Sequence, residues 1–340
     1  MLDNTSQLLL RHPILTPDSW LINANDALSH QAPGLPTLRA HFVYAHAAYR
    51  ADDPMHTLAA ELPSQTIPHA VVYVPKEKAL LHMLMDNLAQ YTTSGTTVHL
   101  VGHNKGGIKS VVKQLGGYWQ QSEKLASGNH CLLYACTRSD QVAPPFTLAS
   151  YRHSYRLAEY SNLEVFNLPG VFSEQKLDQG TQLLLDYLHQ KPRPKSPQRV
   201  LDFACGTGII GAYLRAHYPV AHLTACDISS LALNCSQHTL AAQPNTCDFE
   251  LVASDGLQRI QHRYDWIVSN PPFHTGQKTD YSIAAQFFAA AKQRLHKNGR
   301  LTLVANSFLG YKDMLSPHFA KVEEVQNNNK FKIIEAWQPC

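Results

Sequence analysis

The stretch RVLDFACGTGIIG, residues 199–211, is the part of the sequence that decides the fold. Its apolar start is typical of a buried strand, which ends in Asp202 and continues through Ala204, Gly206 and Gly208 into a helical pattern. Small residues in such a turn let the backbone approach a ligand, and Asp202 can organise either the turn or a cationic ligand group. Because the same turn can serve a dinucleotide or tight packing alone, it does not identify the ligand.

Downstream of this turn, short apolar runs alternate with helical periods, which is typical of a parallel α/β sheet. The expected strands cover residues 199–204, 222–227, 249–255, 265–270, 300–306 and 330–337. The expected helices cover residues 209–217, 231–242, 282–295 and 311–319. Ligands of open α/β sheets bind at the carboxyl ends of the strands, so polar residues at those ends are site candidates.

Two further acids end the next two expected strands. Asp227 comes about 20 residues after the glycine turn, where a carboxylate can accept hydrogen bonds from both hydroxyls of a ribose. Asp255 follows Ser254 at the end of the third strand, where it could accept from an adenine amino group. Each acid alone could be an N-cap or a loop residue. Together with Asp202 they place acids at three successive strand ends, which favours a bound ligand.

The segment DWIVSNPPFH, residues 265–274, carries the chemistry at the end of the fourth strand. An exocyclic amino nitrogen is a poor nucleophile because its lone pair is delocalised into the ring. A site that accepts both N–H bonds, on the Asn270 side-chain oxygen and the Pro271 carbonyl, localises that lone pair in the transition state. The prolines fix the backbone so that these acceptors converge, and Phe273 offers a face for stacking a flipped base.

The N-terminal half repeats the pattern of the C-terminal half in order and residue type. AVVYVPK (70–76) aligns with WIVSNPP (266–272), which sets Val74 opposite Asn270. The later HLVGHN run of the first half aligns with TLVANS of the second half. No glycine-rich turn precedes the first of these strands. We therefore predict two similar α/β domains in tandem, of which the first has lost the residues of the site.

Composition and charge set the broad class. A length of 340 residues suits two domains, and 44% hydrophobic residues can fill their cores. The net charge of +3 is too small to indicate a nucleic-acid binder by itself. The seven cysteines contain no CxxC pair, so a metal site is not expected. The absence of a long apolar run and of a signal-like start leads us to expect a cytoplasmic protein that does not contact a membrane.

These motifs resemble those of class I, Rossmann-like methyltransferases, and most closely the RsmC-type guanine-N2 methyltransferases of small-subunit ribosomal RNA. The resemblance covers nearly the whole chain. It rests on SQLLLRH (6–12), LPGVFSEQKLDQGTQLLLDYL (168–188), NPPFH (270–274), VANSFLGY (304–311) and KFKIIEA (330–336). One departure is Ala204, which stands where the usual pattern has its first glycine.

The resemblance implies a particular organisation of the chain. It places a degenerate methyltransferase-like domain without cofactor over 1–155, a lid segment and linker over 156–198, and the catalytic domain over 199–340. Both domains would be Rossmann-like, the second with a seven-stranded, mostly parallel sheet and an antiparallel last strand. The residues implied to hold S-adenosylmethionine are Asp202, Ala204, Gly206, Gly208, Asp227, Ser254, Asp255 and, from the lid, Phe172 and Gly180. Those implied to hold the target guanine are Asn270, Pro271 and Phe273.

The implied activity is methyl transfer from S-adenosylmethionine to N2 of one guanine of 16S rRNA in the 30S subunit, by a monomer that needs no metal. The same chemistry on 23S rRNA, by the sister family, is the nearest alternative. Glutamine-N5 methylation of a release factor also uses NPP, usually followed by tyrosine rather than by the phenylalanine of Phe273. A non-enzymatic alternative is an RNA-binding assembly factor, which the three acids and the complete NPPF motif disfavour.

Overall fold

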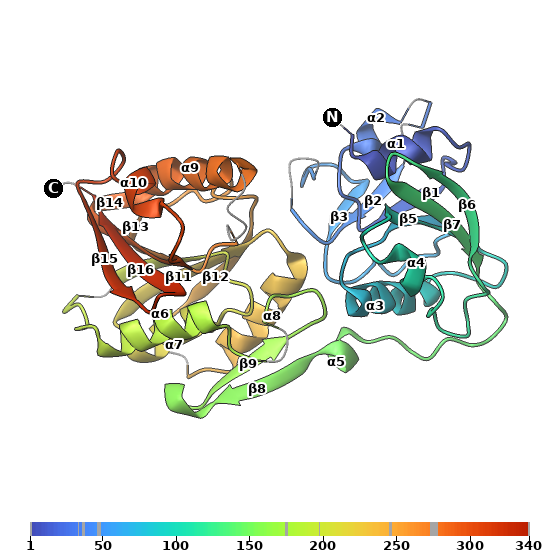
Figure 1. The fold of residues 1–340 in the computed structure, drawn as a ribbon. Helices are drawn as coiled ribbons and strands as arrows, with labels where there is room; N and C mark the ends of the chain where they lie inside the picture. The colour runs from blue at the N-terminus through green and yellow to red at the C-terminus, as the bar shows by residue number, and fades with distance from the viewer. Residues whose placement is uncertain are drawn as a thin grey trace. The chain divides into compact units, whose positions relative to one another are not determined.

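The computed structural model describes residues 2–32, 34–35, 38–45, 49–173, 176–196, 198–244, 247–272 and 278–338, without the side chains of 278–280. The chain divides into two compact units, Met1–Arg152 and His153–Cys340. Each unit contains a seven-stranded sheet with helices on its faces (Figure 1). The predicted tandem of two α/β domains is therefore confirmed.

The sheet of the second unit has the strand order β12-β11-β10-β13-β14-β16-β15. Its strands are β10 (Gln198–Phe203), β11 (Val220–Asp227), β12 (Phe249–Ala253), β13 (Tyr264–Ser269), β14 (Leu295–Asn306), β15 (Lys321–Asn327) and β16 (Phe331–Trp337). Neighbours from β12 to β14 pair in parallel, whereas β16 runs antiparallel to both β14 and β15. The predicted seven-stranded, mostly parallel sheet with an antiparallel last strand is confirmed.

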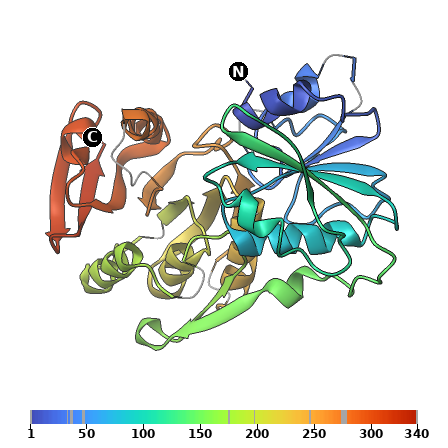
Figure 2. The same ribbon diagram turned by 45° about the vertical axis from the view of Figure 1, so that its right-hand side comes forward.

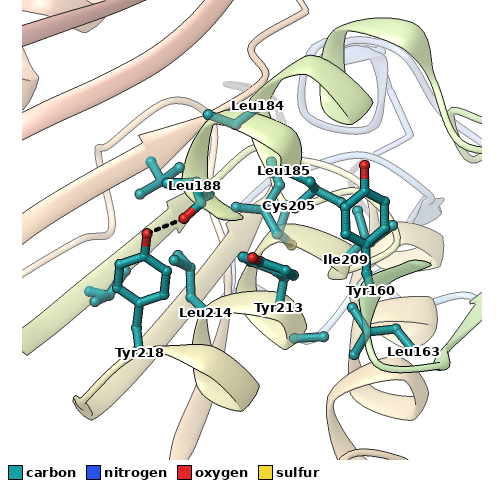
Figure 3. Close-up of a cluster of buried hydrophobic side chains, with 14 of the residues drawn as sticks. Tyr160, Leu163, Leu184, Leu185, Leu188, Cys205, Ile209, Tyr213, Leu214 and Tyr218 are labelled. Atoms are coloured by element: carbon teal, nitrogen blue, oxygen red, sulfur yellow. Dashed lines mark hydrogen bonds between the residues drawn. The ribbon is translucent and has the colours of Figure 1, made fainter. Parts of the chain in front are cut away.

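Helices cover both faces of this sheet (Figures 1 and 2). They are α6 (Gln179–Gln190), α7 (Ile209–His217), α8 (Ser230–Ala241), α9 (Lys278–Gln293) and α10 (Tyr311–Leu315). Successive strand residues point to opposite faces, so Val200 packs with α6 and α7 while Leu201 packs with α9 and α10. Figure 3 shows the first of these cores, where Tyr218 donates a hydrogen bond of 2.6 Å to the carbonyl oxygen of Leu188 at the end of α6.

The sequence expectations for the second unit did not include α6, β15 or the elements between residues 153 and 167. β15 is an edge strand with the sequence KVEEVQN, whose side chains are half-buried or exposed, so it has no apolar run to identify it. The predicted lid and linker, 156–198, includes all of α6 and all of β9 (Leu163–Asn167). β9 forms a hairpin with β8 (His153–Leu157) around the short helix η1 (Ala158–Tyr160).

The first unit has the strand order β3-β2-β1-β4-β5-β7-β6, which is the order of the second unit strand for strand. Its strands are β1 (Ser19–Ile22), β2 (Arg39–Phe42), β3 (His56–Leu58), β4 (His69–Tyr73), β5 (Thr97–His103), β6 (Glu123–Gly128) and β7 (Cys131–Thr137). Its helices are α1 (Asn4–Leu10), α2 (Leu28–Gln31), α3 (Lys78–Ala89), α4 (Ile108–Val111) and α5 (Leu148–Tyr151). No helix in the described part of either unit is long and apolar enough to cross a membrane.

The two units can be matched residue by residue. The residue after the first strand has a left-handed backbone in both units, with φ of 54° at Asn23 and 55° at Ala204. When these two residues are matched, the parallel pairing of the first and fourth strands sets Tyr73 opposite Asn270. The sequence alignment that set Val74 opposite Asn270 is therefore wrong by one residue, because it matched prolines rather than strand register.

Backbone hydrogen bonds beyond the strands support this register. The amide of Ala59 donates to the carbonyl of Phe42 at 3.2 Å, and the amide of Ser254 donates to the carbonyl of Asp227 at 3.0 Å. These two bonds occupy equivalent places after the third strand of each unit. The register of the fifth strands also confirms the predicted match of HLVGHN with TLVANS. The match can therefore be used to compare the two units position by position.

Candidate active site

Most of the residues predicted for the site lie at the carboxyl ends of four neighbouring parallel strands of the second unit. Ala204 follows β10, Asp227 ends β11, Ser254 follows β12 and Asn270 follows β13. The strand pairs β12–β11, β11–β10 and β10–β13 bring these ends side by side. The structure therefore collects the cofactor candidates and the target candidate at one edge of one sheet, where α/β proteins bind their ligands.

The turn between β10 and α7 is built from residues with positive φ. These angles are 55° at Ala204, 54° at Gly206 and 77° at Gly208. An added Cβ at Gly208 would lie 2.9 Å from the backbone Cα of Ser236, so this position requires glycine for space as well as for conformation. An added Cβ at Gly206 would meet no described atom within 4 Å, which leaves the turn open on that side for a ligand.

Ser236 on α8 supports the same turn, although no sequence motif pointed to it. Its buried hydroxyl donates to the carbonyl of Gly206 at 2.9 Å and lies 3.2 Å from the sulfur of Cys205. A serine inside a helix is ordinary in sequence, and its neighbour here lies 30 positions earlier in the chain. Such a tertiary contact becomes visible only when α8 is placed against the turn.

Asp202 is completely buried beneath the turn. Its Oδ2 accepts the backbone N–H of Gly211 in the first turn of α7 at 2.8 Å, and its Oδ1 has no hydrogen-bond partner among the described residues. The pKa of this carboxyl is raised to about 7, chiefly by burial, with the bond from Gly211 opposing the rise and the nearby charge of Asp227 adding to it. Of the two roles open to Asp202, the structure shows the organisation of the turn.

Asp227 faces the turn from the end of β11. Its Oδ2 accepts the amide of Gly206 and its Oδ1 accepts the amide of Ser229, both at 2.9 Å. Burial raises the pKa of Asp227, and these amide bonds lower it. The backbone N–H of Ile228 also interacts with this carboxylate. The role predicted for Asp227 in binding the hydroxyls of a ribose remains a prediction.

The end of β12 contributes Ser254 and Asp255 to the same edge. Ser254 is buried, and its hydroxyl oxygen accepts the amide of Arg259 at 3.1 Å, so its side chain holds the following loop. Asp255 is half-buried at the strand end. Gly256 follows it with a φ of 58° and open space at its Cβ position. The roles predicted for Ser254 and Asp255 in binding adenine remain predictions.

Asn270 stands at the end of β13 and is half-buried. Its Nδ2 donates to Asp178 Oδ2 at 3.1 Å and to Thr181 Oγ1 at 2.8 Å, both at the start of α6. Pro271 is buried beside it, whereas Phe273 lies outside the described residues. Asp178 and Thr181 were not among the predicted site residues, although the N-cap pattern of LDQGT was visible in the sequence.

The two lid residues predicted to contact the cofactor occupy different environments. Phe172 is 59% exposed. Gly180 is buried at the start of α6, where an added Cβ would lie 3.0 Å from Asp178 Oδ2 and 3.3 Å from the ring of Phe331. Gly180 therefore allows the close approach of α6 to β16 on the Asn270 side of the site. A contact of either residue with a cofactor remains a prediction.

One group of described residues has a composition suited to a metal, namely His30, Asp53 and His56 in the first unit. The Nδ1 of His56 accepts the backbone N–H of Arg50 at 3.2 Å. The proton of that imidazole is therefore on Nε2, which lies 2.8 Å from the hydroxyl of Ser29. With Nδ1 accepting from the backbone and Nε2 protonated, His56 has no lone pair for a metal in this arrangement.

Comparison with known proteins gives consistent results over the whole chain. The family described as Methyltransferase small domain matches residues 162–335, and Methyltransferase small domain N-terminal matches residues 6–155. The ribosomal RNA small subunit methyltransferase C of Pseudoalteromonas atlantica is 36% identical, with 98% of each chain covered. The protein of the same name from Shewanella pealeana is also 36% identical, again with 98% of each chain covered.

A solved structure has the same two-unit fold. It is described as the T. thermophilus 16S rRNA N2 G1207 methyltransferase (RsmC) in complex with AdoMet and guanosine. The two chains superpose with a TM-score of 0.82 over 99% of this chain and 92% of the other, at 22% sequence identity. This likeness supports the Rossmann-like architecture of both units.

Proposed function

The chain belongs to the ribosomal RNA small subunit methyltransferase C family, and we propose that it methylates N2 of one guanine in 16S rRNA with S-adenosylmethionine. The observation that carries this proposal is the position of the Asn270 amide at the end of β13. Its nitrogen donates hydrogen bonds to Asp178 and Thr181 at the start of α6. The T. thermophilus protein is named for G1207, and we infer that the corresponding guanine is the target here. The substrate would be the 30S subunit in the cytoplasm, and a single chain would suffice.

The residues at the edge of the sheet fit S-adenosylmethionine. When bound, this cofactor supplies an electrophilic methyl group on a positively charged sulfur. Asp227 offers a carboxylate at the end of β11 for the ribose hydroxyls, and Asp255 offers one after β12 for the adenine amino group. The open side of Gly206 lets the backbone of the turn come close to the cofactor.

The chain's own contribution to the chemistry is to position and polarise the guanine amino group. One N–H of that group would donate to Asn270 Oδ1 and the other to the carbonyl of Pro271. Both hydrogen bonds become stronger as positive charge develops on the nitrogen. Fixed acceptors therefore stabilise the transition state more than the ground state, which lowers the barrier. No base is needed before transfer, because the amino nitrogen can lose its proton afterwards.

The alternatives are weaker on specific grounds. Methylation of 23S rRNA or of a release-factor glutamine does not agree with the small-subunit family to which the chain belongs. An inactive assembly factor would not need acids at three strand ends, and the first unit shows that the fold forms without them. We propose that the first unit binds no cofactor and serves in docking to RNA or in supporting the second unit.

The test is to map modified nucleosides in ribosomal RNA from a strain that lacks the gene. We expect one N2-methylguanosine to be absent from 16S rRNA, and to return with the wild-type gene but not with Asn270→Ala. Loss of a methyl group from 23S rRNA, loss of glutamine methylation in a release factor, or an unchanged map would each contradict the proposal.

A further inference from the structure

We propose that Asp178 and Thr181 are positioning residues that hold the Asn270 amide with its oxygen toward the target amino group. This inference rests on the proposed function and adds to it, because it assigns a task to the start of α6 that no strand-end motif contains. Such partners are needed because an amide that can rotate freely can present either its oxygen or its nitrogen to the target amino group. Only the oxygen can accept the N–H of an amine.

The hydrogen bonds determine which way the amide points. A carboxylate has no proton to donate, so the group of Asn270 that lies 3.1 Å from Asp178 Oδ2 must be the NH₂. The same NH₂ donates its second proton to Thr181 Oγ1 at 2.8 Å. Both protons are therefore used, and Oδ1 is turned away from α6. Among the described residues, no protein group donates to Oδ1, which agrees with an acceptor kept for a substrate.

The start of α6 is itself held in place. Asp178 is the N-cap of this helix, and its Oδ2 accepts the amides of Gly180 at 2.9 Å and Thr181 at 3.0 Å. The helix is anchored further along by the fully buried Leu184 and Leu188 (Figure 3). A fixed helix terminus can orient Asn270 before substrate arrives, so no reorganisation is needed during the reaction.

The carboxylate also changes the amide electronically. A hydrogen bond from the NH₂ to a negative charge draws the electrons of the amide toward its oxygen, and such bonds reinforce one another in a partly buried site. Asn270 Oδ1 becomes a stronger acceptor while Asp178 keeps its negative charge. The effect is largest when the target nitrogen becomes positive, so it should appear in kcat rather than in the affinity for cofactor.

The first unit has the same link with a different outcome. Its first helix, α1, has Asp3 as N-cap and Ser6 as third residue, which are the places of Asp178 and Thr181 in α6. The hydroxyl of Ser6 lies 2.7 Å from the hydroxyl of Tyr73, the residue that matches Asn270. The link between helix and fourth strand thus belongs to the shared fold, and only the second unit places an amide at its end.

The first test compares two variants of Thr181 in the full-length protein with 30S subunits as substrate. Thr181→Val keeps the shape but removes the acceptor, and we expect kcat to fall about tenfold while the Kd for S-adenosylmethionine stays within about twofold. Thr181→Ser restores the hydroxyl and should recover most of the rate. Ser6→Ala removes the equivalent bond of the first unit and should leave kcat unchanged.

The second test exchanges the two partners. Asn270→Asp alone sets two carboxylates against each other, and we expect a loss of about 100-fold in kcat. Adding Asp178→Asn restores a donor and an acceptor in the reverse sense, and asparagine remains a good N-cap. The double variant should therefore be about tenfold more active than Asn270→Asp alone.

A purely structural role of α6 would give different results. If Thr181→Val has the kcat of the wild type, or if the double variant is no more active than Asn270→Asp, the positioning role is wrong. A failure of the proposed function looks different, because wild-type protein would then leave 16S rRNA unmethylated or Asn270→Ala would remain fully active. The two kinds of failure are therefore distinguishable.

Discussion

The two units have one strand order and one register, yet their strand ends differ in chemistry. The first unit has apolar residues where the second has acids: Leu21, Phe42 and Ala60 stand opposite Asp202, Asp227 and Asp255. The first unit folds without these carboxylates, so the fold does not require them. Burial of the Asp202 and Asp227 carboxylates costs free energy, and the fold does not need them, which points to a ligand at the end of the second sheet.

The turn after the first strand differs in the same way. Gly206 and Gly208 have positive φ in the second unit, whereas the position of Gly208 is held in the first unit by Ala27 with a φ of −84°. The second unit also supports its turn with α8. Between Phe42 and His56 of the first unit, the described residues, which leave out 46–48, contain no helix. The second unit thus has both the open glycine turn and the acids at its strand ends, whereas the matched positions of the first unit have neither.

The largest expected effect distinguishes the ends of the fourth strands. Asn270→Ala should lower methyl transfer by about 100-fold or more, because one acceptor for developing charge is lost. The affinity for S-adenosylmethionine, measured by calorimetry, should change little. Tyr73→Phe is the matched change in the first unit and should leave the rate unaltered. Equal effects of the two variants on the rate would contradict the assignment of the site to the second unit.

A smaller effect is expected at the ends of the second strands. Asp227→Asn should weaken S-adenosylmethionine binding by about tenfold, because charge-assisted bonds to the ribose are replaced by neutral ones. Phe42→Leu, at the matched place, should lower the stability of the first unit without changing the cofactor Kd. The comparison would fail if titration calorimetry gave Asp227→Asn the affinity of the wild type.

The smallest expected effect concerns the stability of the second unit and its pH dependence. Burial raises the pKa of Asp202 to about 7, so the folded state resists the loss of this proton more than the unfolded state does. The wild type should therefore lose stability as pH rises from about 4 to about 7. Asp202→Asn removes this loss, so its free energy of unfolding relative to the wild type should rise by on the order of 1 kcal/mol or more between pH 5 and pH 8. Urea unfolding with identical pH slopes for both proteins would show that Asp202 does not carry this cost.

Much of the fold could be predicted from local pattern. The buried strands β10 and β13 are continuous apolar runs, and the acids at strand ends meet because parallel strands share one edge. The edge strand β15 could not be found, since its polar side chains show no apolar run. The one-residue error in aligning the two units arose because the sequence alignment matched two prolines. Strand register is set instead by the hydrogen-bond pairing between strands.

Site residues within local motifs could be predicted, but hydrogen bonds between residues far apart in the chain could not. Asn270 was identified from the chemistry of the amide and its position after a strand. Its partner Asp178 lies 92 positions earlier, and no local pattern joins the two. Ser236 was missed for the same reason, because its contact with the turn depends on the placement of α8. Tertiary hydrogen bonds of this kind appear only in the folded chain.

The central claim is that only the second of two similar units binds the cofactor. Isothermal titration of the full-length protein with S-adenosylmethionine tests this claim most directly. The account predicts about one cofactor per chain, bound at the carboxyl ends of the second sheet, and a large loss of affinity in Asp227→Ala. About two cofactors per chain, or unchanged binding in Asp227→Ala, would contradict it.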